Sequence, residues 1–326
     1  MFDSYLRRWD LVPDGDPIVT PAARLLPVRH RGNAAILKIA SEHDERFNAV
    51  LMTWWDGDGV ARVLAHDDDA LLLERAEGTQ SLTEMARSGR DDEACRILCA
   101  VAARLHRPRA KPLPDLIPLV DWFRDLEPAA SKHGGILPRC AQTAEALLAE
   151  PREVGVLHGD LHHGNVLDFG SRGWLAIDPK RLIGERGFDF ANIFTNPDID
   201  DGIPAVATDP NRFERRLAIV TEAAGLERTR LLRWILAWTG LSAVWFLGDG
   251  NEKFAAEASM ARPARAPFAG AACGLLSTAA PPASGSPLAP RAVSPPPFDS
   301  SQQRLVSTTR VGPGRMLRVQ RAGERA

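Results

Sequence analysis

The segment "LHGDLHHGNVLDFGSRGWLAID" (residues 157–178) decides the fold, because its polar side chains fit only a few kinds of site. It contains three of the eight histidines, together with Asp160, Asn165 and Asp178. Zinc and iron centres use His and Asp as ligands, whereas phosphotransferases use Asp and Asn to bind magnesium and to orient a hydroxyl group. The surrounding sequence has to distinguish these two chemistries.

The histidines superficially match a zinc-ligand run. His158, Asp160, His162 and His163 follow the pattern H-x-D-x-H-H. Binuclear hydrolases with such runs need further His or Asp ligands from later loops. His163 is the last histidine of the chain, so no later imidazole can complete the coordination sphere. A metallohydrolase therefore stays only a minor alternative.

The same residues have the spacing of a kinase catalytic loop. In the pattern H-G-D-x-x-x-x-N, the aspartate accepts the proton of the substrate hydroxyl and the asparagine binds magnesium. Here these residues are Asp160 and Asn165. A second magnesium carboxylate is expected after a short hairpin, and Asp178 follows two predicted strands, 165–169 and 174–178. Asp160 is thus the candidate catalytic residue, and Asn165 and Asp178 are the candidate metal ligands.

The upstream sequence supplies the remaining parts of a kinase site. A kinase needs a strand lysine for the nucleotide phosphates and a helix glutamate to hold that lysine. The strand-like run "AAILKIA" (34–40) provides Lys38, and the next helix provides Glu45, with Glu42 as the alternative. Either residue alone could be solvated surface. The order Lys, Glu, HGDxxxxN and IDP favours a kinase.

The hydrophobic pattern predicts an α+β, protein-kinase-like fold with two lobes. Short apolar runs between residues 18 and 76 predict a small antiparallel sheet, interrupted by one helix over residues 43–55. Later segments have helical spacing, and they span residues 91–106, 137–150, 210–225 and 227–248. We expect a nucleotide-binding lobe at 1–76, a larger, mainly helical catalytic and substrate-binding lobe at 77–260, and a cleft between them.

Composition and charge limit the partners of the protein. Four scattered cysteines predict no disulfide framework, and the N-terminus lacks the apolar region of a signal peptide. The apolar stretch 234–248 is shorter than the roughly 20 residues of a membrane span. Residues 1–260 carry a formal net charge of −9. We expect a cytoplasmic protein without a membrane or nucleic-acid partner, and an acidic body of this kind suits a cationic ligand.

The segment 261–326 differs from the rest of the chain. It contains nine arginines, no lysine and ten of the 25 prolines. It shows neither helical nor strand periodicity, so it cannot bury enough apolar surface to offset its ordering entropy. We expect this tail to be disordered or to derive from a frameshift near residue 262.

Several motifs together carry a family resemblance. "HGDLHHGN" followed by "GWLAIDP" resembles the corresponding loop of aminoglycoside phosphotransferases, a branch of the protein-kinase-like fold. Streptomycin 6-kinases are more specifically similar, over roughly residues 5–262, through "LMTWWDGDGVARVLA", "DDEACRILC", "GERGFDFANIFTNPD" and "RLLRWILAWTGLSAVWFLGDG". The resemblance implies a monomer that phosphorylates the 6-hydroxyl of streptomycin with ATP and magnesium, which confers antibiotic resistance.

The resemblance also implies a role for each matching residue. Asp160 would be the catalytic base, Asn165 and Asp178 would hold magnesium, Lys38 would bind the nucleotide phosphates, and Glu45 would hold Lys38. In "LLLERAEG" (71–78), Glu74 and Ala76 would contact adenine through their main chain. His158 and Asp189 would brace the catalytic loop, whereas His162 and His163 would pack the loop or line the substrate rim.

Substrate recognition is expected to depend on carboxylates. Streptomycin carries guanidinium groups, which form bidentate contacts with Asp and Glu. The candidate partners in the C-terminal half are Asp198, Asp200, Asp201 and Asp249. Two alternatives stay open, namely a related kinase for another small hydroxylated substrate and a non-catalytic kinase-like binding protein.

Overall fold

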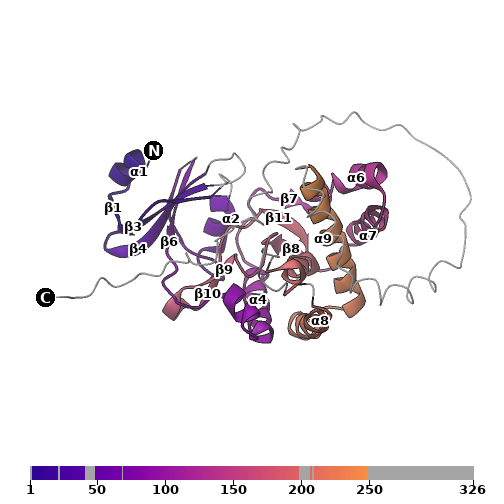
Figure 1. Ribbon diagram of the computed structural model, residues 1–326. Helices are drawn as coiled ribbons and strands as arrows, with labels where there is room; N and C mark the ends of the chain where they lie inside the picture. The colour runs from indigo at the N-terminus through magenta and orange to yellow at the C-terminus, as the bar shows by residue number, and fades with distance from the viewer. Residues whose placement is uncertain are drawn as a thin grey trace, which may run out of the picture.

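The N-terminal lobe is built on a six-stranded antiparallel sheet. The computed structural model describes residues 2–20, 23–40, 48–67, 69–197, 206–207 and 209–248. The strand order is β1-β3-β4-β6-β5, with β2 paired to β3. The strands are β1 (Leu11–Pro13), β2 (Ile18–Val19), β3 (Ala23–His30), β4 (Asn33–Ala40), β5 (Val63–His66) and β6 (Ala70–Glu74). The predicted antiparallel sheet is confirmed (Figure 1).

The two faces of this sheet have different surroundings, because successive side chains of a strand point to opposite sides. Leu37 on β4 is buried in a small cluster that also includes the aromatic side chain of Tyr5 from α1 (Asp3–Arg8). Lys38, the next residue, therefore lies on the opposite face. There its side chain reaches Asp178 of the C-terminal lobe. The strand register thus directs this lysine toward the space between the lobes.

The helix α2 (Asn48–Trp55) follows β4 but packs into the core of the C-terminal lobe. Leu51, Met52 and Trp55 are almost completely buried there. The indole N–H of Trp55 donates to the carbonyl oxygen of Leu105 at 3.1 Å. The helix predicted over residues 43–55 is therefore confirmed from residue 48 onward.

The C-terminal lobe is mainly helical, and each of its four predicted helices is present (Figure 1). Its helices are α3 (Leu82–Arg87), α4 (Asp91–Leu105), α5 (Leu119–Trp122), α6 (Leu126–His133), α7 (Leu137–Ala149), α8 (Pro210–Ala224) and α9 (Arg228–Gly248). Local sequence explains the ends of α8. The Asp209 side chain accepts from the Asn211 N–H at 2.8 Å, Pro210 opens the helix, and Gly225 ends it with a φ of 62°.

Short strands position the segment 157–178. β8 (Val154–Leu157) pairs antiparallel with β11 (Leu182–Glu185), which pairs parallel with β7 (Ile117–Pro118). β9 (Val166–Asp168) and β10 (Trp174–Ala176) form an antiparallel hairpin around the 3₁₀ turn η2 (Gly170–Arg172). The loop 158–165 leaves β8, and the segment 177–181 leaves β10. The Ile177 N–H donates to the Asn165 carbonyl at 2.9 Å, so these two segments lie side by side.

A buried ion pair holds the helices behind this loop. Arg216 on α8 donates to both carboxylate oxygens of Asp91, the first residue of α4. Its Nη1 also donates to the carbonyl oxygens of Ile193 and Asn196, each at 2.6 Å. Ile193 belongs to the 3₁₀ helix η3 (Arg186–Thr195). The guanidinium therefore ties α4, α8 and η3 together in the interior.

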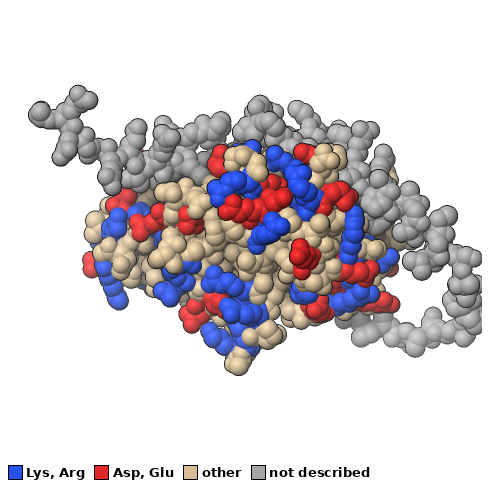
Figure 2. Space-filling model, turned by 90° about the horizontal axis from the view of Figure 1, so that it is seen from below, with Lys and Arg blue, Asp and Glu red and all other residues tan. Residues whose placement is uncertain are grey.

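The described surface mixes both signs of charge. In Figure 2, Lys and Arg are interspersed with Asp and Glu over the visible face.

Within the described residues no helix is both long enough and apolar enough to cross a membrane, including the 21-residue α9. The lobe boundaries at residues 76 and 260 stay predictions, and the tail 261–326 lies outside the described part of the chain.

Candidate active site

The catalytic loop begins at His158, whose ring braces the main chain. Its Nδ1 accepts from the Asp160 N–H at 3.2 Å, and its Nε2 is 2.9 Å from the Ile177 carbonyl oxygen. Burial lowers the pKa of His158 to about 4, so the neutral ring can accept at one nitrogen and donate at the other. The Trp55 ring stacks on this imidazole with an interplanar angle of 18°. The contacts match the structural role expected for His158.

Asp189 on η3 holds the same loop from behind. Its carboxylate accepts from the His158 N–H at 2.9 Å and from the Gly159 N–H at 2.7 Å, and it contacts His106 Nε2 at 2.8 Å. Burial would raise the pKa of Asp189, but the hydrogen bond and charge of His106 outweigh it and keep this pKa below its usual value. Asp189 thus braces the loop, as expected from "GFDFAN".

Asp160 lies at the centre of the site with both carboxylate oxygens bonded. Asn165 Nδ2 donates to its Oδ2 at 2.9 Å, and Asn192 Nδ2 donates to its Oδ1 at 2.6 Å. Burial raises the pKa of Asp160 to about 8, against the charge of Lys180 and the two amide hydrogen bonds. A carboxylate with a raised pKa is a better proton acceptor when it is ionised. This environment suits a group that takes a proton from a substrate hydroxyl.

Lys38 and Asp178 meet between the lobes. Lys38 Nζ donates to Asp178 Oδ1 at 2.8 Å, although the two residues are 140 positions apart in the sequence. Burial raises the pKa of Asp178, but the charge and the hydrogen bond of Lys38 lower this pKa by more. The pKa of Asp178 therefore lies below its usual value. Asp178 therefore remains an anion beside the catalytic loop.

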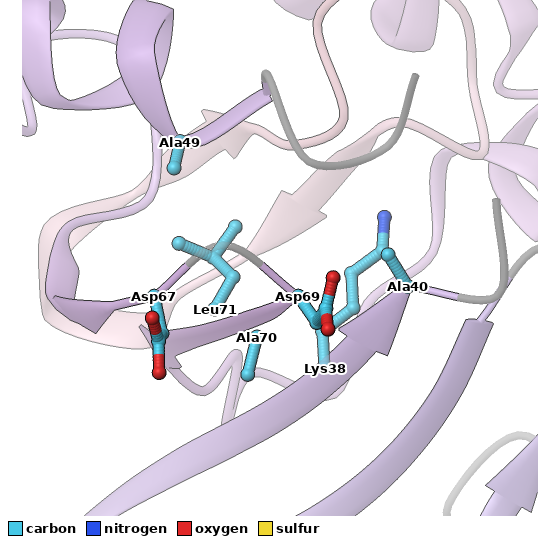
Figure 3. Close-up of a pocket in the computed structure, with 7 residues that line it drawn as sticks. All are labelled: Lys38, Ala40, Ala49, Asp67, Asp69, Ala70 and Leu71. Carbon is cyan, nitrogen blue, oxygen red and sulfur yellow. The ribbon is translucent and has the colours of Figure 1, made fainter. Parts of the chain in front are cut away.

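A hollow adjoins Lys38 on the N-terminal lobe (Figure 3). Lys38 and Leu71 are register partners on β4 and β6, and both side chains line it. The other lining residues come from β4, α2, β6 and the turn between β5 and β6, and they are Ala40, Ala49, Asp67, Asp69 and Ala70. The lysine thus lies beside a hollow on the same lobe that was predicted to bind the nucleotide.

The donor set of the site fits magnesium. Both N–H groups of the Asn165 amide are directed at Asp160, toward its Oδ2 and its main-chain oxygen at 3.0 Å. Its carbonyl oxygen is therefore the group left to bind a cation, beside the anionic Asp178. Magnesium is typically bound by one or two protein oxygens together with substrate phosphates. Asn165 and Asp178 satisfy this requirement without further protein ligands.

The histidines do not form a zinc site. Among the residues that the structure describes, no group of three or more His, Cys, Asp and Glu side chains is arranged to hold a metal ion. The His162 Nδ1 accepts from the Gly164 N–H at 3.1 Å, and His163 is 2% exposed with no hydrogen-bond partner at either nitrogen. Burial lowers the pKa of His162 to about 3 and that of His163 well below its usual value. Both rings are buried, which fits the loop-packing role among the two roles expected for them.

The segment between the lobes is anchored through Glu74 and Gly78. The Glu74 carboxylate accepts from the Arg62 N–H at 2.6 Å and from the Arg172 guanidinium of η2. The Gly78 N–H donates to the Asp168 carbonyl at 2.9 Å. The side chain of Glu74 is thus occupied by structural contacts, and the predicted adenine contacts of Glu74 and Ala76 involve the main chain only.

Several predicted site residues lie outside the described part of the chain. They are Glu42 and Glu45, expected near Lys38, and the proposed substrate carboxylates Asp198, Asp200, Asp201 and Asp249. Two other residues were not predicted. Lys180 follows Asp178 and donates its N–H to the His158 carbonyl at 2.7 Å, and Asn192 contacts Asp160. The sequence signal for Asn192 was its position three residues after Asp189, because residues three apart share one face of a 3₁₀ helix.

Comparisons with known proteins identify relatives of this chain. A family model described as "Aminoglycoside/hydroxyurea antibiotic resistance kinase" matches residues 8–250. A streptomycin 3''-kinase of Klebsiella pneumoniae is 57% identical over 245 residues, which cover 75% of this chain and 92% of the relative. A streptomycin 6-kinase of Streptomyces griseus is 33% identical over 262 residues, covering 74% of this chain and 81% of the relative.

Solved structures show the same fold at low identity. A thermostable aminoglycoside phosphotransferase mutant, solved with ADP and hygromycin B, has a TM-score of 0.55 at 16% identity and covers 78% of this chain and 94% of its own. A choline/ethanolamine kinase family protein from Mesorhizobium loti has a TM-score of 0.58 at 17% identity, with coverages of 80% and 92%. The predicted α+β, protein-kinase-like fold is confirmed.

Fold and site together define a phosphotransferase of the protein-kinase-like class. The match over residues 8–250 and the 57% identity place it more narrowly. The chain belongs to the aminoglycoside/hydroxyurea antibiotic resistance kinase family. The resemblance to aminoglycoside phosphotransferases is thereby confirmed. The narrower assignment as a 6-kinase is not supported specifically, because a named 3''-kinase is 57% identical to this chain and a named 6-kinase only 33%.

Proposed function

We propose that this protein transfers the γ-phosphoryl group of ATP to a hydroxyl group of streptomycin and so confers resistance to it. The observation that carries the proposal is the buried Asp160 carboxylate, held by two amides in a loop that also presents Asn165 and lies beside Asp178. The relatives named for streptomycin support the choice of substrate. We further propose that the protein acts in the cytoplasm as a monomer.

Similarity to named relatives supports the choice between two hydroxyl positions. A 57% identical relative is named a streptomycin 3''-kinase, whereas the named 6-kinases are 33% and 32% identical. We therefore favour the 3''-hydroxyl over the 6-hydroxyl that the sequence motifs suggested. The 6-hydroxyl is retained as the alternative, since family motifs alone do not separate the two.

The residues of this chain divide the reaction between them. Asp160 accepts a hydrogen bond from the substrate hydroxyl and takes its proton as the new O–P bond forms, while the bond between the β- and γ-phosphates breaks and ADP leaves. Lys38 binds phosphate oxygens. A second lysine, Lys180, lowers the pKa of Asp160 through its charge. The buried loop keeps Asp160 in place while substrates bind.

Magnesium would be held by Asn165 and Asp178. When bound, it neutralises charge on the nucleotide phosphates and orients them for in-line transfer. In this structure Lys38 Nζ donates to Asp178 Oδ1 at 2.8 Å. The flexible four-carbon side chain of Lys38 allows its ammonium group to turn toward phosphate oxygens. Adenine binding is proposed at the main chain of Glu74 and Ala76.

The product of the reaction tests this proposal. Purified protein is incubated with ATP, magnesium and streptomycin, and the product is analysed by mass spectrometry and by phosphorus–proton NMR. We expect one added phosphoryl group, coupled to the proton at the 3''-carbon. Coupling at the 6-carbon would support the alternative position. No phosphorylated streptomycin, with a phosphorylated hydroxyurea or other small hydroxylated compound instead, would favour a different substrate for the same chemistry.

A further inference from the structure

Asn192 contacts the catalytic carboxylate from behind the loop. Its Nδ2 lies 2.6 Å from Asp160 Oδ1, closer than the 2.9 Å between Asn165 Nδ2 and Asp160 Oδ2. Asp160, Asn165 and Asn192 are 4%, 7% and 5% exposed. At such burial, water does not readily replace a lost donor, so the amide of Asn192 matters for the carboxylate it touches.

The 3₁₀ geometry of η3 places Asn192 there. A 3₁₀ helix has three residues per turn, so side chains three positions apart lie on one face. Asp189, Asn192 and Thr195 have this spacing within the ten-residue η3. Asp189 holds the main chain of the catalytic loop, and Asn192 holds its carboxylate. One face of η3 therefore supports both parts of the loop.

Asn192 is itself fixed by hydrogen bonds. Its Oδ1 accepts from Thr195 Oγ1 at 3.1 Å and from Asn196 Nδ2 at 2.9 Å. Because a carboxylate oxygen of Asp160 accepts, the Nδ2 group of Asn192 is the one that faces it, and Oδ1 is left for Thr195 and Asn196. Trp238 Nε1 on α9 donates to Thr195 Oγ1 at 3.2 Å and extends the network into the helical core.

We propose that Asn192 is a positioning residue for phosphoryl transfer, which fixes the plane of the Asp160 carboxylate so that it faces the substrate hydroxyl. The proposal rests on the proposed function and deepens it. Asn165 and Asn192 bind different oxygens of the same carboxylate, so rotation about its Cβ–Cγ bond breaks both hydrogen bonds. With Asn165 alone, which also serves the metal, the carboxylate could turn away from the hydroxyl.

Kinetics of Asn192 variants test this role. In Asn192→Ala we expect kcat to fall about 10- to 100-fold, because small displacements of a reacting group carry losses of this size. The KM values for ATP and streptomycin should stay within about threefold, since Asn192 is buried behind the loop. Asn192→Asp keeps the size of the side chain but removes the donor, and it should lose at least as much. Thr239→Val is the matched control, because Thr239 Oγ1 is buried and bonded only within α9, to the Ile235 carbonyl at 2.7 Å.

A double-mutant cycle separates positioning from general damage to the fold. In an Asp160→Ala background there is no carboxylate to position, so adding Asn192→Ala should lower kcat by less than about threefold. A further loss as large as in the wild-type background would overturn the proposal. So would a wild-type kcat in both Asn192 variants, or a loss confined to KM.

The outcome can be distinguished from failure of the proposed substrate. If the wild-type protein does not phosphorylate streptomycin, the same variants are compared in magnesium-dependent hydrolysis of ATP, where Asp160 orients water in place of a hydroxyl. A fall of about 10- to 100-fold in the hydrolysis rate of Asn192→Ala would support the positioning role even though the substrate proposal fails. The positioning role would be overturned if Asn192→Ala hydrolysed ATP as fast as the wild-type protein. It would also be overturned if the wild-type protein catalysed neither reaction.

Discussion

The catalytic loop and the strand that carries Lys38 reach the site from different lobes and are anchored differently. Asp160 is bonded at both oxygens by side chains of its own lobe, and its side chain is 6% exposed. Lys38 crosses to Asp178, whose side chain is 31% exposed. The comparison contrasts the proposed proton-accepting side, which is bonded within its own lobe, with the proposed phosphate-binding side, whose Lys38 contact joins the two lobes.

The largest effect is expected at Asp160, on the proposed proton-accepting side. Asp160→Asn removes the proton acceptor but keeps its size and its loop, so kcat should fall at least about 10²-fold. Steady-state kinetics with streptomycin measure this, and circular dichroism checks the fold. Asp115→Asn is the matched control, because the Asp115 side chain is 91% exposed and its ion pair with Arg181, at 3.3 Å, lies on the surface. An Asp160→Asn protein as active as this control would contradict the role of Asp160.

The support behind the loop predicts a large effect on stability. Arg216→Met leaves Asp91 as an uncompensated buried charge and removes two main-chain contacts to the η3 region, so the free energy of unfolding should fall by about 3 to 5 kcal/mol. Urea denaturation measures the change. The neighbouring Arg215 is half exposed and pairs with Asp92 at 3.2 Å, so Arg215→Met should change stability by less than about 1 kcal/mol. Equal losses in both variants would show that the buried network does not support the loop.

On the phosphate-binding side the effect should appear in nucleotide affinity. Lys38→Met removes a charged hydrogen-bond donor worth about 1.5 to 3 kcal/mol, so KM for ATP should rise by about tenfold or more. The KM for streptomycin should change little. Exposed Lys132 on α6 supplies the control Lys132→Met. An unchanged KM for ATP in Lys38→Met would exclude Lys38 from nucleotide binding.

The smallest effect concerns the connection between the lobes. A Cβ at Gly78 would lie 1.9 Å from Asp168 Cγ, so Gly78→Ala must displace the Asp168 carboxylate and should cost about 1 to 3 kcal/mol in stability. Gly155 has no atom within 4 Å of such a Cβ and provides the control Gly155→Ala. Thermal unfolding of both variants measures the difference, and a Gly78→Ala protein as stable as the control would show that this contact yields freely.

Much of the fold was predictable because it depends on local periodicity. The short apolar runs became β3 to β6, and the helical patterns became α4, α7, α8 and α9 within a residue or two of their expected ends. The spacing of Asp160, Asn165 and Asp178 also predicted a convergent site, since a loop and a short hairpin bring such residues together. Family resemblance narrowed this to aminoglycoside phosphotransferases.

The unpredicted part depends on contacts that no local pattern encodes. The contact between Lys38 and Asp178 joins positions 140 apart, and Asn192 reaches Asp160 from η3, 32 positions further along the chain. The motifs did not distinguish a 3''-kinase from a 6-kinase, since relatives named for both positions are similar to this chain.

The central claim is that the buried Asp160 side of the site serves transfer from ATP to streptomycin. The most direct measurement is the rate of ADP formation by the full chain with magnesium, in the presence and absence of streptomycin. We expect streptomycin to accelerate ADP formation, with one phosphorylated streptomycin formed for each ADP. An ADP rate that is the same with and without streptomycin, in protein shown to bind ATP, would contradict the account.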